Sequence, residues 1–163
     1  MEALDSLINQ TVDSWEGILV LDKGAEKDTE KIFESFNHPK FLKYKCKTHK
    51  GAEQARHTAI KLASTDWFFQ LDSDDKIPLD AINEILKKIS ENPQAEFIFG
   101  TTMHFSKSSS YLMPPSKNPE VLSTSALFSS QMPIKISMYF RVGGYANELR
   151  YFAADWDFWL TVY

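Results

Sequence analysis

The first half of the chain alternates short apolar runs with segments of helical periodicity. Apolar residues that recur every three or four positions predict helices over residues 2–10, 29–36, 51–63 and 78–91. Apolar runs between them predict strands over residues 17–21, 41–44, 67–71 and 96–105. Strands that alternate with helices are typical of βαβ units, so we expect an α/β fold, a mostly parallel Rossmann-like sheet flanked by helices.

The second half of the chain has a different pattern. Residues 106–120 contain five serines and three prolines, which predicts a long surface loop of the kind that often carries function. Beyond it, residues 134–140 predict a strand, Gly143 and Gly144 interrupt the pattern, and residues 155–160 predict a helix. No linker or repeat divides the 163 residues, so we expect a single domain.

Composition excludes several classes of protein. The net charge of −4 and the pI of about 5.6 lack the basic excess of proteins that bind nucleic acid phosphates. Cys46 is the only cysteine, so neither an intramolecular disulfide nor a cysteine-rich zinc site can form. The acidic start is unlike a signal peptide, and no apolar run approaches about 18 residues. We therefore expect a cytoplasmic domain, which a partner could bring to the inner face of the membrane.

The strongest candidate site is the acidic segment after the third predicted strand. This position puts the carboxylates of Asp72, Asp74 and Asp75 at the C-terminal edge of the sheet, where α/β folds bind ligands. Strand alternation would point Asp72 and Asp74 to the same side. Two such carboxylates favour Mg²⁺ or Mn²⁺ completed by substrate phosphates. A solvated acidic turn before the next helix explains the same residues without function.

Three further residues are candidates, each with a structural alternative. Arg56 lies on the polar side of its predicted helix. It is either a surface cation or a guanidinium that binds phosphate or base oxygens. Asp22 ends the first predicted strand, where it either accepts hydrogen bonds from a nucleobase or ribose or forms the turn before Gly24. Asp155, beside Trp156 at a predicted helix start, is either a helix cap or a general base.

In order and spacing, these pieces resemble the family 2 glycosyltransferases, which have the GT-A (nucleotide-diphospho-sugar transferase) fold. The matching segments cover nearly the whole chain and are Ser6–Thr11 with Trp15 and Glu16, Leu21–Gly24, Gly51–Ala59, Leu71–Asp75, Gly143–Tyr145 and Asp155–Leu160. Leu21–Gly24 resembles the family's Asp-Asp-Gly-Ser block. Gly51–Ala59 resembles its G-x-x-x-A-R-N-x-A block, and Leu71–Asp75 resembles its D-x-D block. Lys23, Ala25, His57 and Ala154 depart from the family pattern.

The resemblance implies a metal-dependent, inverting transfer of a sugar from a nucleotide-diphosphate-sugar to a glycan or lipid-linked acceptor. The nucleotide-sugar-binding residues that it implies are Asp22, Arg56, Asp72 and Ser73. It implies that Asp72 and Asp74 hold Mn²⁺ or Mg²⁺, and that Asp155 is the general base that deprotonates the acceptor hydroxyl.

Family members begin with an apolar strand before the first helix, whereas this chain begins at that helix and ends inside another. The resemblance therefore implies a GT-A domain over residues 1–163 that is truncated at both ends, with an unpaired sheet edge through which copies could associate. A shortened, non-catalytic relative that acts as a binding or structural module is the alternative function, and a nucleotidyltransferase is the third.

Overall fold

The computed structural model describes residues 1–49, 51–106, 109–113, 131–146 and 154–162. Its helices are α1 (Glu2–Ile8), α2 (Lys27–Ser35), α3 (Ala52–Leu62), α4 (Ala81–Glu91), α6 (Ile136–Arg141) and α7 (Ala154–Val162). Its strands are β1 (Gly17–Leu21), β2 (Phe41–Lys45), β3 (Trp67–Phe68), β4 (Thr102–Phe105), β5 (Ser110–Met113) and β6 (Ile134–Lys135). Helices and strands alternate through the first half, which confirms the α/β class.

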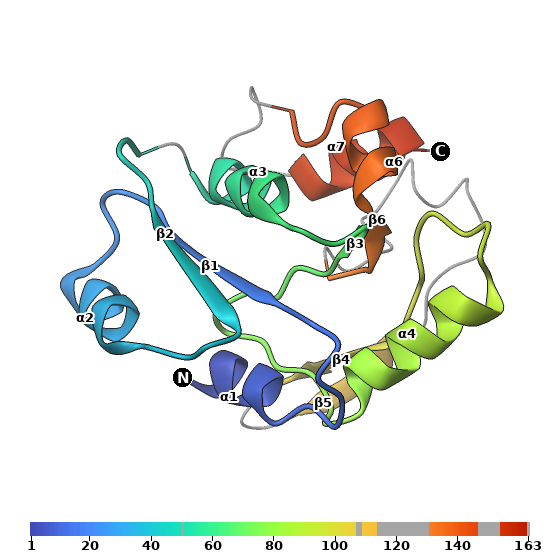
Figure 1. Cartoon of the computed structure of the whole chain (residues 1–163), viewed down its shortest axis with the longest axis horizontal. Coiled ribbons are helices and arrows are strands. Elements are labelled where there is room, and N and C mark those ends of the chain that lie inside the picture. Colours follow the sequence, from blue (N-terminus) through green and yellow to red (C-terminus); the bar gives the residue numbers. More distant parts are fainter. Residues whose placement is uncertain (50, 107–108, 114–130, 147–153, 163) are drawn as a thin grey trace.

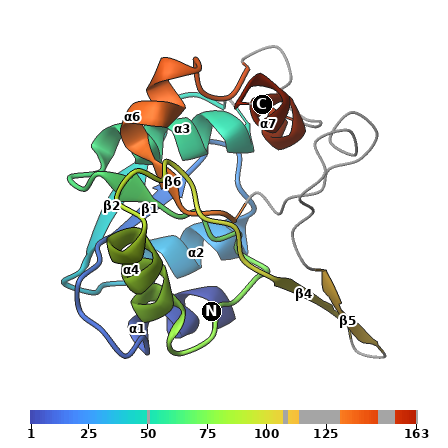
Figure 2. The same cartoon turned by 90° about the vertical axis from the view of Figure 1, so that its right-hand side faces the viewer.

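A parallel pair of strands, β1 and β2, lies between two helices. Gly17 lies opposite Phe41 and Leu21 opposite Lys45, so the register spans both strands completely. α3 and α2 lie on opposite sides of this pair in both views (Figures 1 and 2). Gly17 permits the pairing, because a Cβ at this position would overlap the Phe41 ring. Among the described residues, β1 pairs with β2 alone.

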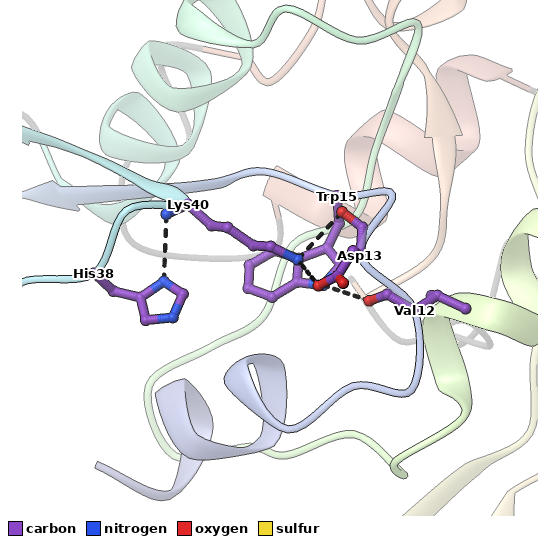
Figure 3. Close-up of polar contacts among 5 residues, drawn as sticks. All are labelled: Val12, Asp13, Trp15, His38 and Lys40. Carbon is purple, nitrogen blue, oxygen red and sulfur yellow. Dashed lines mark hydrogen bonds and ion pairs between the residues drawn. The ribbon is translucent and has the colours of Figure 1, made fainter.

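A polar and aromatic cluster around Trp15 and Lys40 holds the segments that lead into β1 and β2 (Figure 3). The Lys40 ammonium lies 4.6 Å from the centroid of the Trp15 ring and contacts the Asp13 carboxylate. The Trp15 indole donates to the Val12 carbonyl at 3.0 Å, and the Lys40 N–H donates to Nδ1 of His38 at 3.3 Å. These contacts position the two strand starts beside each other.

The main hydrophobic core lies among α3, α6, α7 and the short antiparallel pair of β3 and β6 (Figure 1). Tyr139 of α6 is fully buried, and Phe158 of α7 is 1% exposed. The buried members are Ile60, Met132, Ile134, Met138, Tyr139, Tyr145, Phe158 and Trp159. This core fixes α3 and α7, which both carry predicted site residues, relative to the end of β3.

α1 is tied to the start of α4 by the side chain of Gln10. Its amide donates to the Pro78 carbonyl at 2.6 Å, and its carbonyl oxygen accepts from the Ile82 N–H at 2.9 Å. Gln10 therefore satisfies one of the N–H groups that the first turn of α4 leaves open. Among the described residues, no helix is long and apolar enough to cross a membrane.

Residues 134–140 form a short strand and a helix, so the prediction of a strand over this whole range is wrong. Only Ile134 and Lys135 belong to β6, and α6 begins at Ile136. The run is apolar except for Lys135 and Ser137, and a short, mainly apolar run fits a strand or a buried helix equally well. The helix buries Met138 and Tyr139 together, so packing against the core decides the outcome.

The strands predicted on either side of α4 are shorter than expected. The third predicted strand pairs only over Trp67–Phe68, and the fourth forms a ladder only over Thr102–Phe105. Before Gly100, a single bridge joins Phe97 to Ile134.

The loop predicted over residues 106–120 contains β5, which pairs antiparallel with β4. The resulting hairpin extends away from the body of the protein (Figure 2). Residues 107–108 and 114–120 of this loop lie outside the described residues.

Candidate functional site

Arg56 and Asp72 lie at the centre of the candidate site. Nη2 of Arg56, on α3, donates to Oδ1 of Asp72 at 2.5 Å, and the two side chains are 26% and 31% exposed. Burial works against the positive charge of Arg56, but the hydrogen bond and the charge of Asp72 outweigh it and raise its pKa. The structure thus brings together two of the predicted nucleotide-binding residues.

The acidic segment after β3 turns sharply instead of continuing as a strand. The Asp75 N–H donates to the Asp72 carbonyl at 3.1 Å, and Ser73 and Asp74 between them are exposed. The alternation argument for Asp72 and Asp74 therefore does not apply, because it requires extended backbone. Asp72 faces Arg56, whereas the Asp75 carboxylate accepts from the side-chain amide of Gln131.

Asp22 lies at the end of β1, as predicted, and its carboxylate contacts the start of α3. Oδ2 accepts from the Gly51 N–H at 3.0 Å and lies 2.7 Å from Nδ1 of His49. Oδ1 accepts from the Lys23 N–H at 3.0 Å. Gly51, the N-cap of α3, has φ of +89°, a conformation that favours glycine. A cavity of about 480 Å³ opens beside Asp22 and is lined by Lys23, Gly24, Thr48 and His49.

Tyr145 connects the acidic segment to α7. Its hydroxyl donates to Oε1 of Gln70 at 2.7 Å, and the residue is 5% exposed. Burial raises the pKa of Tyr145, with further contributions from Tyr139, Asp155 and Asp72 and an opposing one from Arg56. Asp155, in the first turn of α7, is half-buried and accepts from the Trp156 N–H at 2.9 Å. Arg56, Asp72 and Asp155, which come from three different segments, therefore all lie within electrostatic range of Tyr145.

A match to a known protein family establishes the family of this chain. Residues 1–149 match the family model described as Glycosyl transferase family 2. The protein belongs to glycosyltransferase family 2.

Individual relatives support the same family assignment and show how much of a longer relative this chain covers. A Haemophilus influenzae protein described as an uncharacterized glycosyltransferase is 27% identical over 98% of this chain and 55% of its own length. Among solved structures, S. aureus TarS 1–349 in complex with UDP aligns with a TM-score of 0.74 and 18% identity, over 99% of this chain and 50% of its own. GalNAc-T7 with UDP, GalNAc and Mn²⁺ aligns with a TM-score of 0.64 and 14% identity, over 98% of this chain and 37% of its own. The structural matches show a shared GT-A fold, and the chain spans about half the length of the H. influenzae protein and of TarS 1–349.

Asp72 and Asp74 are the candidate metal ligands of this chain. Among the described residues, no group of three His, Cys, Asp or Glu side chains is arranged to hold a metal ion. Mg²⁺ and Mn²⁺ are commonly held by one or two carboxylates together with substrate phosphates. Asp72, half-buried beside Arg56, and the exposed Asp74 fit that incomplete set, because bound diphosphate would supply the remaining oxygen ligands.

His57, to which the sequence assigns no role, is partly buried and packs against Tyr139. The Tyr145 N–H donates to the Tyr139 hydroxyl at 3.2 Å, and that hydroxyl lies 3.0 Å from Nδ1 of His57. The contact is a hydrogen bond in either tautomer of the neutral ring, because the hydroxyl can both donate and accept. Burial, with a smaller effect from Lys61, lowers the pKa of His57.

Glu53 and Gln70 are two residues of the site that the sequence patterns did not indicate. Glu53 lies one helical turn before Arg56, and their side chains approach to 3.8 Å. Gln70 precedes Asp72 by two residues and holds the Tyr145 hydroxyl. A spacing of three along a helix, applied to Arg56, would have found Glu53, whereas Gln70 lies beyond the end of β3 and follows no strand spacing.

Proposed function

We propose that this chain binds a nucleotide-diphosphate-sugar and transfers the sugar, with inversion, to a hydroxyl of a glycan or lipid-linked acceptor. The observation that carries the proposal is the convergence of Arg56, Asp72, Tyr145 and Asp155 in a member of glycosyltransferase family 2. TarS, which shares the fold, is described in complexes with UDP and with UDP-GlcNAc, which supports a nucleotide-sugar donor.

In this proposal, the nucleotide lies along the C-terminal ends of β1 and β3. Arg56 and Asp72, with Ser73 beside them, contact the nucleotide, and Asp22 holds the helix start that borders it. A guanidinium suits this place because its planar donor fork matches phosphate and carbonyl oxygens. The C-terminal ends of strands are the usual ligand-binding edge of α/β folds.

Asp72 and Asp74 would hold Mn²⁺ or Mg²⁺ together with the diphosphate. When bound, the metal would stabilise the negative charge of the departing nucleoside diphosphate. Mn²⁺ in the GalNAc-T7 structure, which shares the fold, supports a divalent ion in this site.

Asp155 would act as the general base. It lies in the first turn of α7, close enough to Tyr145 for its charge to affect that hydroxyl. A half-buried carboxylate beside the sugar-binding edge can take the proton of an acceptor hydroxyl as that oxygen attacks the anomeric carbon. One base and direct displacement are sufficient for inversion.

Nucleotide binding tests the proposal. We expect UDP or GDP with Mn²⁺ to raise the melting temperature, and Asp74→Ala to abolish the metal-dependent part of the shift. Asp28→Ala, an exposed change on α2, is the control and leaves the shift unchanged. Absence of a shift with every nucleotide and both metals would contradict nucleotide binding.

Turnover assays distinguish the alternatives. Asp155→Asn should remove sugar transfer or donor hydrolysis while leaving nucleotide affinity unchanged, and Asp157→Asn, on the same helix turn, should retain both. Nucleotide binding without any transfer or hydrolysis would indicate a non-catalytic binding module. Release of pyrophosphate from a nucleoside triphosphate would indicate a nucleotidyltransferase.

We also infer that the hairpin of β4 and β5 faces the acceptor at the inner surface of the cytoplasmic membrane. The hairpin has four largely exposed apolar side chains, which are Met103, Phe105, Tyr111 and Leu112. Exposed apolar side chains support contact with a lipid-linked acceptor. Flotation with liposomes tests this, and a Leu112→Ser change should reduce binding. Equal flotation of both proteins would contradict it.

The free edge of β1 supports self-association between copies of the chain. In the part of the chain that the structure describes, this strand has a ladder on one side only, and such edges can pair with another chain. Light scattering across protein concentrations tests this, and a mass of one chain at all concentrations would contradict it.

A further inference from the structure

A cavity of about 470 Å³ opens along one face of α3, which lies between β2 and α6 in both views (Figures 1 and 2). Tyr44 of β2 lines it, together with Gly143 and Tyr145 after α6. The helix contributes residues at spacings of three and four, which share one face; they are Gln54, His57, Thr58, Lys61 and Leu62. Arg56 does not line the cavity, which therefore lies on a different face of α3 from the ion pair with Asp72.

Several polar side chains that line this cavity are left without partners by the fold. The Lys61 ammonium has no carboxylate within ion-pair distance in the described structure, whereas those of Lys40 and Lys45 each contact one. The side-chain amide of Gln54 and the hydroxyl of Tyr44 make no hydrogen bond to the described residues. These groups are accessible from the cavity, so a ligand can bind them without breaking a contact of the folded chain.

His57 has one ring nitrogen available for a ligand. Nδ1 lies 3.0 Å from the Tyr139 hydroxyl, whereas Nε2 has no partner in the described structure. Because the hydroxyl can donate to Nδ1, the ring can carry its own proton on Nε2 and donate it to a ligand. Lys61 lies close enough to His57 for its charge to help lower the pKa of that ring, so a single bound group can reach both residues.

The charge of the cavity favours an anion. No aspartate or glutamate is among the described residues that line it, although the chain as a whole has a net charge of −4. Lys61, Gln54 and His57 together supply an ammonium group, an amide and a ring N–H on one helix face. Hydrogen bonds from such donors to the oxygens of an anion are stronger than those between neutral groups. The lining therefore fits a phosphate group.

The cavity also has room and apolar surface for more than a phosphate group. Its volume lies in the range of sites that bind small organic molecules. Tyr44 and Leu62 on its lining are 38% and 37% exposed, so both present apolar surface. The C–H groups on the face of a sugar ring pack well on an aromatic ring, whose face is electron-rich.

We propose that this cavity binds a phosphorylated sugar, with the phosphate group on Lys61, His57 and Gln54 and the sugar ring on Tyr44 and Leu62. The ligand is either a free sugar phosphate or a phosphodiester unit within a glycan, because both present the same chemistry. This second ligand site goes beyond the proposed transfer reaction and does not depend on it.

Isothermal titration calorimetry of the whole chain tests the proposal without any variant. The ligands are glucose 6-phosphate, its methyl phosphodiester, glucose 1-phosphate, glucose and inorganic phosphate. We expect at least one sugar phosphate to bind at least about tenfold more tightly than glucose, which is the scale of one hydrogen bond to a charged group, and more tightly than inorganic phosphate. A tighter diester would identify a unit of a glycan, and a tighter monoester would identify a free sugar phosphate.

Two variants assign the binding to this cavity. Lys61→Gln should weaken the bound sugar phosphate about 10- to 100-fold. Tyr44→Ala should weaken it about 3- to 10-fold and change the affinity for inorganic phosphate less than about twofold. Lys87→Gln on α4 is the matched control, because it removes the same charge from another exposed lysine, and it should leave every affinity unchanged.

Three results would overturn the proposal, and each leaves nucleotide binding untouched. The first is that no sugar phosphate binds more tightly than glucose. The second is that Lys61→Gln binds sugar phosphate as tightly as the wild-type chain, or is weakened no more than Lys87→Gln, which would place the ligand elsewhere. The third is an unchanged affinity of Tyr44→Ala for sugar phosphate, which would leave a site for a bare oxyanion.

Discussion

Arg56 on α3 donates a hydrogen bond at 2.5 Å to Asp72, which follows β3. The two residues are 16 positions apart in the sequence and come from different elements. Their ion pair links the helix that begins beside Asp22 to the acidic turn of residues 72–75. The pair therefore joins the two ends of the candidate nucleotide site, and its strength can be measured.

A double-mutant cycle with Arg56→Met and Asp72→Asn should give a coupling free energy of about 1 kcal/mol in urea unfolding. The pair is charge-assisted, but each side chain is about a quarter to a third exposed, so solvent screening keeps the value well below that of a buried pair. A coupling indistinguishable from zero would show that the two residues act independently.

Tyr139→Phe should lower the free energy of unfolding by about 1–3 kcal/mol. The Tyr139 hydroxyl accepts from the Tyr145 N–H and faces His57, so its removal leaves buried polar groups without partners. Tyr111→Phe is the matched control: this residue is 62% exposed, and the change should alter stability by less than about 0.5 kcal/mol. Equal effects of the two changes would contradict the proposed arrangement.

The stability of the folded chain should fall between about pH 7 and pH 5, in part because of His57. Its pKa in the folded state is lowered by burial and by Lys61, so the unfolded state takes up a proton first as the pH falls through about 6.5. The loss stops growing below the folded-state pKa, where both states are protonated. Urea unfolding across this pH range measures the effect.

His57→Asn isolates this contribution from that of other titrating groups. The variant should show a flatter dependence of unfolding free energy on pH, because asparagine does not titrate. Identical pH profiles for the wild-type chain and the variant would exclude His57 as a source of the dependence.

Gly144→Ala should destabilise the chain by more than Gly143→Ala. Both glycines have positive φ, +70° and +94°, so either alanine costs about 1–2 kcal/mol in backbone strain. A Cβ at Gly144 would also lie 2.8 Å from the Tyr139 ring, which adds about 1–3 kcal/mol, whereas a Cβ at Gly143 meets no atom within 4 Å. Thermal unfolding of the two variants compares them directly, and equal losses would show that contact with Tyr139 carries no cost.

The positions of Asp22, Arg56 and Asp155 in their elements could be predicted because these positions depend on local pattern. Asp22 ends β1, Arg56 lies within α3, and Asp155 lies in the first turn of α7, as the periodicity indicates. The contacts of these residues could not be predicted. The pairing of Arg56 with Asp72 and the engagement of Asp22 by Gly51 depend on how α3 packs against β1 and the turn of residues 72–75.

The sequence by itself determined the alternation of strands and helices, the family, and the segments that carry the candidate chemistry, because these follow from periodicity and from ordered motifs. Only the tertiary structure decided that residues 136–141 form a helix and that the chain turns at Ser73 and Asp74. It also decided that His57 is held by Tyr139. The physical reason is the same in each case. Short segments have several local conformations of similar free energy, and burial against distant residues and hydrogen bonds formed in the fold select one of them.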